Sequence, residues 1–383
     1  MFSRKSKAVE TEQKIPTIMQ RRWRKFKSLK RGYIAFRVLT VAYLLSFCLP
    51  ILVNNQALMV SYNGQWSFPA VRTFFVELPI VGLLVSNITY QGVSFGQENN
   101  TSECRYRDLK VQYQQQGQGN YVVMPLYPYG PRDIVGADGV KEDVFSKPLA
   151  HTSDGGFRLF GTDDSGADVF SKIAYGFNIS ISFALLLSLI EYLIGVPLGA
   201  ALGYLGGMFD ILMQRVIEIW ASLPLLFLII IIVSMTKPSF GLLLFLLSIV
   251  GWVGITTYIR AEFYREKAKD YVAAAVSIGI PTWKIMLKHI LPNSLVPLIT
   301  FFPFTLIAGI GSLVSLDFLG FGLPPGTPSW GSMISIGLEH INDGYWWLTV
   351  VPLSAMFMTL MLTVFIGEAI REAFDPKVFS RLR

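Results

Sequence analysis

Charged residues are scarce in this chain of 383 residues, where Asp, Glu, Lys and Arg together make up 15% and hydrophobic residues 52%. A soluble protein of this size would carry roughly 25% charged residues. The mean hydropathy of +0.46 points in the same direction. The composition therefore argues against a soluble globular protein and predicts a polytopic membrane protein.

Cysteine and histidine are also rare. Of the two cysteines, Cys48 lies in an apolar run and Cys104 in a polar stretch, so neither has a plausible disulfide partner. The histidines are scattered and match no zinc-binding spacing: His151, His289 and His340. We therefore expect no disulfide framework and no metal site.

Catalytic motifs are missing from the sequence. No segment matches the phosphate-binding pattern GxxxxGK[ST], and no HExxH or plausible Ser/His/Asp or Cys/His arrangement occurs. The chain therefore has no means of hydrolysing ATP by the phosphate-loop route. We expect a non-catalytic protein with no catalytic residue and no cofactor of its own.

What the chain does have is positive charge placed next to apolar runs. The formal net charge is +7, and the basic residues gather in two places: Arg21, Arg22, Arg24, Lys25, Lys27, Lys30 and Arg31, then Arg260, Arg265, Lys267, Lys269, Lys284 and Lys288. Basic residues that flank membrane spans mark the cytoplasmic side and favour anionic lipid. We therefore interpret both clusters as topology signals and not as nucleic-acid-binding patches.

Six apolar segments are long enough to cross a bilayer, which takes about 20 residues. They cover 33–53, 179–204, 214–235, 241–260, 294–318 and 346–367, and a surface-lying helix from Trp23 precedes the first. With the basic arm inside, both termini are cytoplasmic, and the 319–345 loop outside contains no Lys or Arg. The predicted fold is an all-α polytopic membrane protein with six transmembrane helices.

The first two spans enclose a long polar insert, rich in Gln, Asn, Pro and Gly. We expect short strands and loops that pack over the mouth of the membrane domain on the periplasmic side. The predicted organisation is a basic arm with the first span (1–53), a periplasmic insert (54–171), a membrane core (172–370) and a cytoplasmic tail (371–383).

The connection 261–292 is longer than two antiparallel helices require. Alanines favour a helix over 267–278, Gly279 suits the left-handed residue that ends a helix, and Pro281 favours the start of a new one. The sequence predicts two helices joined by a sharp turn at the membrane surface, a shape suited to docking a partner. The alternative is a hairpin that lies on lipid headgroups.

This connection resembles the EAA loop of ABC importer permeases, in which EAA is followed by Gly after three residues and by I-x-L-P after nine more. The matching residues are Ala273, Ala274, Ala275, Gly279, Leu291 and Pro292. Ala273 replaces the family Glu, and His289 stands where Ile is usual. The missing carboxylate leaves Asp270, Glu266 and Glu262 as candidates to replace it.

The resemblance implies that the loop docks in a groove of an ATPase subunit, which uses ATP and Mg. The expected ATPase-coupling residues are Asp270, Tyr271, Ala273, Ala274, Ala275, Gly279, Ile280, Pro281, Leu291 and Pro292.

Three further segments resemble dipeptide and oligopeptide permeases: GTDDSGADV at 161–169, DFLGFGLPPGTPSWG at 317–331 and IGEAIREAFDP at 366–376. The aspartates of the first do not fit a calcium loop, because no Glu closes it. The wording of 54–69 and of the last two segments is similar to the Yej-type branch, associated with peptide and microcin C uptake. The resemblance implies a bacterial inner-membrane location.

It also implies a homologous second permease, ABC ATPase subunits, a periplasmic or lipid-anchored solute-binding protein and a peptide substrate. Within the path for that substrate, Glu191, Asp317 and Phe318 are the candidates. Acids within spans are functional candidates by default, although Glu191 is also interpreted as an interhelical hydrogen-bonding residue.

Two alternatives come from other classes. A self-contained secondary transporter of peptides would need buried ion sites and inverted repeats, which the sequence does not display. A membrane-tethered binding protein would not need six spans. Co-purification of an ATPase subunit distinguishes the importer from both alternatives.

Overall fold

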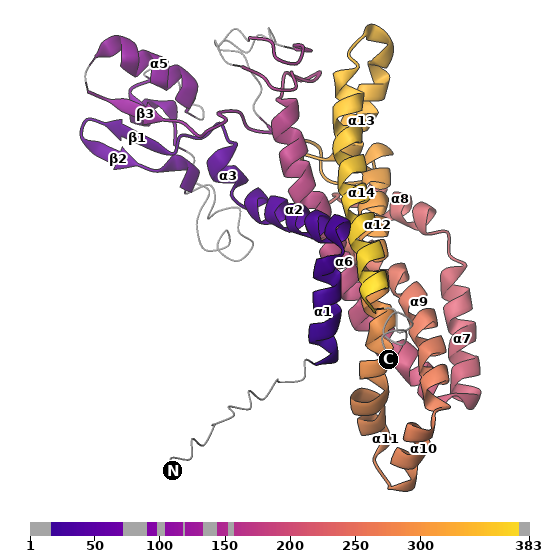
Figure 1. The fold of residues 1–383 in the computed structure, drawn as a ribbon. Helices are drawn as coiled ribbons and strands as arrows, with labels where there is room; N and C mark the ends of the chain where they lie inside the picture. The colour runs from indigo at the N-terminus through magenta and orange to yellow at the C-terminus, as the bar shows by residue number, and fades with distance from the viewer. Residues whose placement is uncertain are drawn as a thin grey trace, which may run out of the picture.

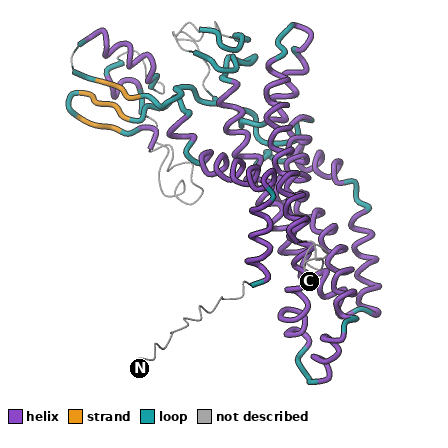
Figure 2. The backbone as a smooth tube through the Cα atoms, viewed as in Figure 1, coloured by secondary structure: helices purple, strands orange, loops and turns teal. Residues whose placement is uncertain are grey.

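The computed structural model describes residues 17–71, 90–97, 104–117, 119–132, 144–151 and 157–374. Long helices make up most of this part of the chain, and a small sheet projects beside them (Figures 1 and 2). The first 16 residues, much of the predicted periplasmic insert, and residues 375–383 of the predicted tail lie outside the described residues. Asp375 and Pro376 of the family-like C-terminal segment fall there too.

The chain begins with three helices, α1 (Ile18–Ser28), α2 (Lys30–Ser46) and α3 (Leu49–Leu52). A capping box between Thr17 and Gln20 starts α1 five residues before the expected Trp23. The prediction of one helix over 33–53 is wrong at its end: the chain turns at Phe47 and Cys48, and Pro50 occupies the first turn of α3.

The insert contains a three-stranded antiparallel sheet in the order β2-β1-β3, from β1 (Met59–Tyr62), β2 (Gln65–Ser67) and β3 (Tyr121–Val123). Asn63 and Gly64 join β1 to β2 with φ of 49° and 77°, as a tight hairpin requires. The sheet packs on α5 (Tyr106–Gln116) and on a 3-10 turn, Gly92–Phe95, through Val60, Phe95 and Leu109. The strands were expected, whereas α5 was not.

Four long helices are candidate spans among the described residues: α6 (Val169–Leu205), α9 (Phe240–Lys267), a continuous stretch from Thr282 to Phe318, and α14 (Trp347–Phe374). That stretch comprises α11 (Thr282–Lys284), a π turn (Ile285–Ile290) and α12 (Leu291–Phe318). The loop after α12 leads to α13 (Trp330–Glu339) and a 3-10 turn, Ile341–Asp343.

The span expected over 214–235 consists of two helices, α7 (Gly207–Ala221) and α8 (Leu225–Met235), bent by 60°. Pro224 has no amide hydrogen to continue the helical ladder, which accounts for the break. Counted as one span, this pair brings the described spans to five, and α2 is too short to be counted. The six-span topology stays a prediction.

A ladder of three glycines holds α6 against α9. A Cβ added at Gly199 would lie 2.5 Å from the carbonyl oxygen of Thr256, and one at Gly203 would lie 2.5 Å from that of Arg260. The third glycine, Gly195, accepts a 3.3 Å hydrogen bond from the Thr256 hydroxyl. The backbones of these two helices approach so closely because no side chain separates them.

Polar contacts tie the insert to the start of α6. Tyr127 donates a hydrogen bond of 2.7 Å to Asp168, the N-cap of α6, and the Ser171 hydroxyl donates one of 2.8 Å to the Tyr129 carbonyl oxygen. The Arg158 guanidinium, fully buried, lies 3.4 Å from the centre of the Tyr129 ring. The sheet and α5 thus lie at one end of α6, and α10 and α11 at the other (Figure 1).

Candidate coupling hairpin

The connection between α9 and α12 folds as a hairpin, but not with the single first helix predicted over 267–278. The α9 helix runs on to Lys267, and a separate helix, α10 (Asp270–Ser277), follows. Lys269 is extended, with φ −86° and ψ 150°, and caps the start of α10. The helical propensity of the alanines was read correctly, but the redirection at Lys269 depends on a contact that propensity does not describe.

That contact is made by Glu266, whose side chain is 3% exposed at the end of α9. The Lys269 ammonium lies 2.7 Å from one carboxylate oxygen, and the Tyr271 hydroxyl donates a 2.9 Å hydrogen bond to the other. Burial raises the pKa of the Tyr271 hydroxyl, so it remains a donor at neutral pH. Asn293 donates a bond of 3.4 Å to Tyr271, which links α12 to the same cluster.

The turn after α10 has the predicted geometry. Gly279 has a φ of +81°, and the Ile280 amide donates a 3.1 Å bond back to the Ala275 carbonyl oxygen. Pro281 then caps α11. Gly279 and Pro281 together reverse the chain within three residues. Gly279 adopts a left-handed conformation that is unfavourable for residues with a Cβ, and Pro281 has no amide hydrogen with which to continue α10.

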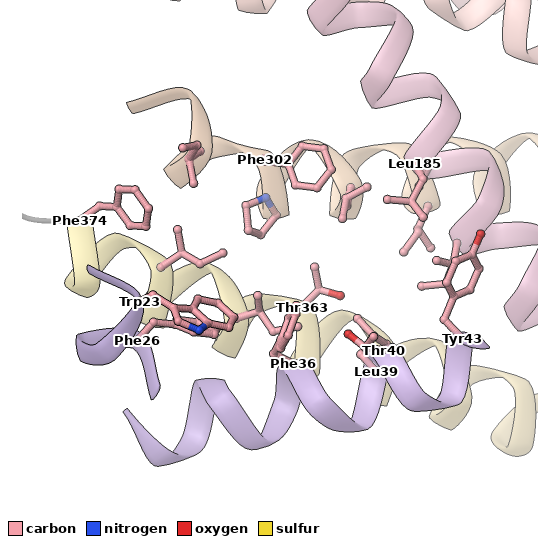
Figure 3. Close-up of a pocket in the computed structure, with 18 of the residues that line it drawn as sticks. Trp23, Phe26, Phe36, Leu39, Thr40, Tyr43, Leu185, Phe302, Thr363 and Phe374 are labelled. Atoms are coloured by element: carbon pink, nitrogen blue, oxygen red, sulfur yellow. The ribbon is translucent and has the colours of Figure 1, made fainter. Parts of the chain in front are cut away.

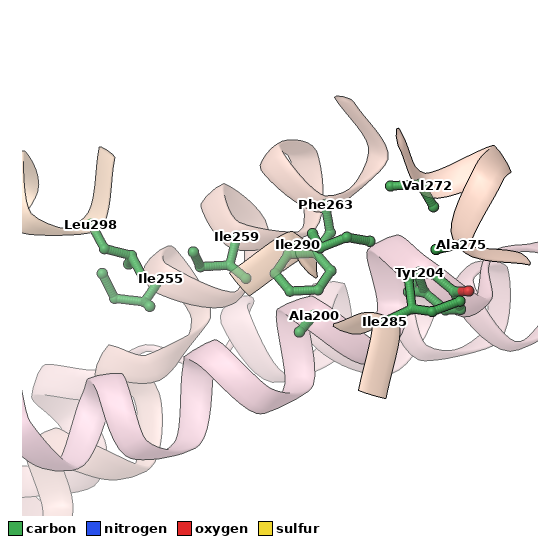
Figure 4. Packing of buried hydrophobic residues seen from close by; sticks show 10 residues of the cluster. All are labelled: Ala200, Tyr204, Ile255, Ile259, Phe263, Val272, Ala275, Ile285, Ile290 and Leu298. Carbon is green, nitrogen blue, oxygen red and sulfur yellow. The ribbon is translucent and has the colours of Figure 1, made fainter. Parts of the chain in front are cut away.

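Beneath the turn, buried apolar side chains join the hairpin to the ends of the long helices (Figure 4). Val272 and Ala275 of α10 and Ile285 and Ile290 of the π turn are each less than 5% exposed. They pack in one cluster with residues of α6, α9 and α12: Ala200, Tyr204, Ile255, Ile259, Phe263 and Leu298. Displacing the hairpin would therefore displace the helices to which it is packed.

The opposite face of the hairpin is exposed and largely apolar. Ala273 and Ala274 are exposed, and four large side chains, which the sequence analysis did not single out, are more than half exposed: Val276, Ile278, Trp283 and Leu287. Exposed charges lie around them: Arg265, Lys269, Asp270, Lys284 and Lys288. Large apolar residues that recur between charged residues in a surface segment could have indicated this exposed face from the sequence.

The three candidate replacements for the missing Glu differ in exposure. Glu266 is buried in the cluster already described, and Glu262 is 8% exposed with the Arg265 guanidinium 2.6 Å away. Asp270, by contrast, is exposed in the first turn of α10. Of the three, Asp270 is the carboxylate available to a partner.

The path candidates lie at separate places. Glu191 faces α9, where a Cβ on Gly251 would lie 1.9 Å from its carboxylate oxygen. Asp317, 7% exposed, accepts hydrogen bonds from the Leu323 amide (2.5 Å) and from Ser329. Phe318 beside it is 40% exposed. Asp317 thus holds the outer loop together.

A cavity of about 460 Å³ lies among α1, α2, α6, α12 and α14 (Figure 3). Its lining is almost wholly apolar, with aromatic residues such as Trp23, Phe36 and Phe302, and with Thr40, Tyr43 and Thr363 as its hydroxyl-bearing residues. A zwitterionic solute would lose its hydration there without matching partners, at a high free-energy cost. The cavity therefore suits apolar groups and does not resemble a path for peptides.

Comparison with known proteins defines the class first. Residues 195–380 match the family described as the binding-protein-dependent transport system inner membrane component. The match contains the whole hairpin and every candidate span from the second half of α6 onward. This part of the chain thus matches an inner-membrane component of a binding-protein-dependent transport system.

Full-length relatives narrow this class. The chain is 35% identical over 363 residues to the peptidoglycan transport system permease protein YejE of Agrobacterium fabrum (strain C58), covering 94% of this chain and 93% of that one. It is 36% identical over 365 residues to the inner membrane ABC transporter permease protein YejE of Escherichia coli (strain K12), covering 95% and 98%. It is also 36% identical over 241 residues to the dipeptide transport system permease protein DppC of Bacillus subtilis (strain 168), covering 62% of this chain and 74% of that one.

The chain therefore belongs to the YejE-type permeases of this transport family, and the resemblance read from the motifs is confirmed. It is a multi-pass inner-membrane protein that works in an ABC importer with ATPase and substrate-binding partners.

Proposed function

We propose that this permease forms half of a translocation path for short peptides or peptide-bearing solutes. The hairpin 261–292 transmits the conformational change of the ATPase to the membrane helices. A homologous second permease would supply the other half of the path. Related permeases are named for dipeptide and for peptidoglycan transport, which supports a substrate with peptide bonds.

The observation that carries the coupling role is the exposed face of the hairpin. Val276, Ile278 and Trp283 are 55%, 79% and 61% exposed, and basic side chains surround them. An apolar centre within a charged rim is the usual composition of a protein docking surface. Ala273 and Ala274 add no bulk to this face, so a partner groove can approach the α10 backbone closely.

The mechanism follows from the continuity of the helices. ATP and Mg would bind the partner ATPase, whose closure would press on the hairpin. The chain is helical from Thr282 to Phe318, and the cluster around Ile285 and Ile290 joins the hairpin to α6 and α9. Movement at the turn would therefore tilt these helices, and nucleotide state would shift the balance between two openings of the path.

The hairpin and the small sheet lie at opposite ends of the helices, which supports placing the hairpin in the cytoplasm and the insert in the periplasm (Figure 1). There the insert, within residues 54–171, would meet the solute-binding protein. The remaining division would be arm and first span (1–53), core (172–370) and cytoplasmic tail (371–383), with six spans and both termini inside.

Two neighbouring alanines provide the test. Ala274 is exposed and Ala275 is 4% exposed in the cluster under the hairpin. We expect Ala274→Trp to give a folded permease that no longer co-purifies with its ATPase, because the added ring blocks docking. Ala275→Trp should instead lower the yield of folded protein by overpacking the core. If the folded Ala274→Trp variant still retains the ATPase and imports at the wild-type rate, the hairpin is not the docking element.

A further inference from the structure

Two contacts show which residues of α7 lie beside which residues of α9 along the helix axes. Near the hairpin end, Arg260 lies 2.6 Å from Asp210, and ten residues along α7 the Trp220 indole donates a 2.9 Å bond to the Ile249 carbonyl oxygen. The α9 stretch from Phe240 to Ile259 contains no charged residue. At 1.5 Å per residue, positions 215 and 218 lie about 7 and 12 Å beyond the Asp210 level, beside this apolar stretch.

Two charged residues occupy that depth on α7. Arg215 and Glu218 form an ion pair of 2.6 Å, and their side chains are 71% and 54% exposed in the isolated chain. Both side chains lie beside the apolar stretch of α9, which is part of a candidate span. Ionised groups are strongly disfavoured against hydrocarbon, so this part of α7 must face a polar environment in the assembled protein.

The charges are confined to one side of the helix. At 100° per residue, Glu218 and Arg215 lie about 60° apart, and Ile211, which is 53% exposed, falls between them. The arc next to it presents Leu212, Val216 and Ile219, each more than half exposed and apolar. The charged residues thus lie on a different side of α7 from its widest exposed apolar surface.

We propose that Arg215 and Glu218 line the inner half of the translocation path and bind the charged ends of a passing peptide. The Arg215 guanidinium would receive the terminal carboxylate and Glu218 the terminal ammonium, because the pair presents both signs side by side. This inference rests on the proposed function and adds the residues that recognise a zwitterionic substrate class.

The test uses single cysteines in the assembled transporter with its ATPase, in proteoliposomes. Cys48, which is exposed, is first replaced by Ser, while Cys104 is buried and stays. Arg215→Cys and Glu218→Cys are compared with Val216→Cys, a neighbour at the same depth that is 52% exposed on the apolar arc. The probe is a hydrophilic methanethiosulfonate, which reacts with thiolates in water and not with thiols in lipid.

We expect positions 215 and 218 to be modified at least tenfold faster than position 216. Equal rates at the three positions would overturn the inference, as would protection of 215 and 218 together with their oxidative cross-linking to the second permease. In Ile211→Cys, which keeps both charged residues and is 53% exposed on the same side of α7, diglycine should slow the modification, whereas N-acetyl-diglycine amide, which lacks both charges, should not. If both peptides or neither slow it, the arc does not recognise peptide ends.

Failure of this inference is distinguishable from failure of the proposed function. The cysteine variants change α7, which is not part of the hairpin, so each should retain the ATPase on purification. A transporter that keeps its ATPase but shows no selective modification at 215 and 218 refutes the path assignment alone. Loss of the ATPase from the Ala274→Trp variant bears on coupling alone.

Discussion

The Tyr271 hydroxyl lies 2.9 Å from a carboxylate oxygen of Glu266 and joins the first hairpin helix to the end of α9. The contact is shielded, since the Glu266 side chain is 3% exposed. Through it, the orientation of α10 depends on a helix that crosses the membrane. A hairpin that only lay on lipid headgroups would have no need of such a tether.

The Tyr271–Glu266 bond should therefore show strong energetic coupling. In a double-mutant cycle of Tyr271→Phe and Glu266→Gln, we expect a coupling of about 1 kcal/mol, the difference between a hydrogen bond to a carboxylate and one to the neutral Gln oxygen. Thermal unfolding in detergent measures the stability, and peptide import measures the function. Strictly additive effects of the two substitutions would show that the contact does not hold α10.

Gly279 should tolerate substitutions in the order of their left-handed propensity. A Cβ at this position meets nothing within 4 Å, so the cost arises from the φ of +81° and not from a clash. We expect Asn to be nearly neutral, Ala to cost about 1–2 kcal/mol, and Pro, which cannot adopt this φ, to uncouple import while leaving membrane insertion intact. Import by Gly279→Pro at the wild-type rate would contradict the role of the turn.

The glycine ladder should be intolerant of even one methyl group. Gly199→Ala would place its Cβ 2.5 Å from the Thr256 carbonyl oxygen, so α6 and α9 must separate, at about 1–3 kcal/mol. Gly254→Ala is the matched control, because nothing lies within 4 Å of a Cβ there and alanine favours the helix by up to ~1 kcal/mol. Thermal unfolding should rank Gly199→Ala below wild type and Gly254→Ala at or above it. Equal melting temperatures would mean that the helices are less tightly packed than described.

Substitution of Asp317 should lower the stability of the protein and affect transport only as a consequence. Asp317→Ala leaves the buried Leu323 amide and Ser329 hydroxyl without their acceptor, at about 1–3 kcal/mol each. Phe318→Ala, at a neighbouring and 40% exposed position, should leave the unfolding temperature almost unchanged. A raised KM for import with normal stability in Asp317→Ala would instead place this carboxylate in contact with the substrate.

Backbone conformation could be predicted from the sequence wherever a single residue type restricts it. Gly279 and Pro281 predicted the turn because few residues adopt a positive φ and proline lacks an amide hydrogen. The apolar runs predicted the spans because about 20 such residues cross hydrocarbon. Motif spacing predicted the family, which the full-length relatives confirm.

Other features depended on partners distant in sequence. The alanines favour one continuous helix through Lys269, but the chain is redirected there. Glu266 binds Lys269 and Tyr271, and Asn293 binds Tyr271. The roles of Glu266 and Asp270 differ by burial, which neither composition nor spacing reveals.

The sequence by itself determined that this is a membrane permease with a sharp turn at Gly279 and Pro281, since hydrophobic length and backbone preference are properties of short segments. Tertiary structure alone decided which carboxylate is available to a partner and which stretch of α9 lies beside Arg215 and Glu218. Those properties arise from contacts between helices, and a linear pattern does not specify which helices meet.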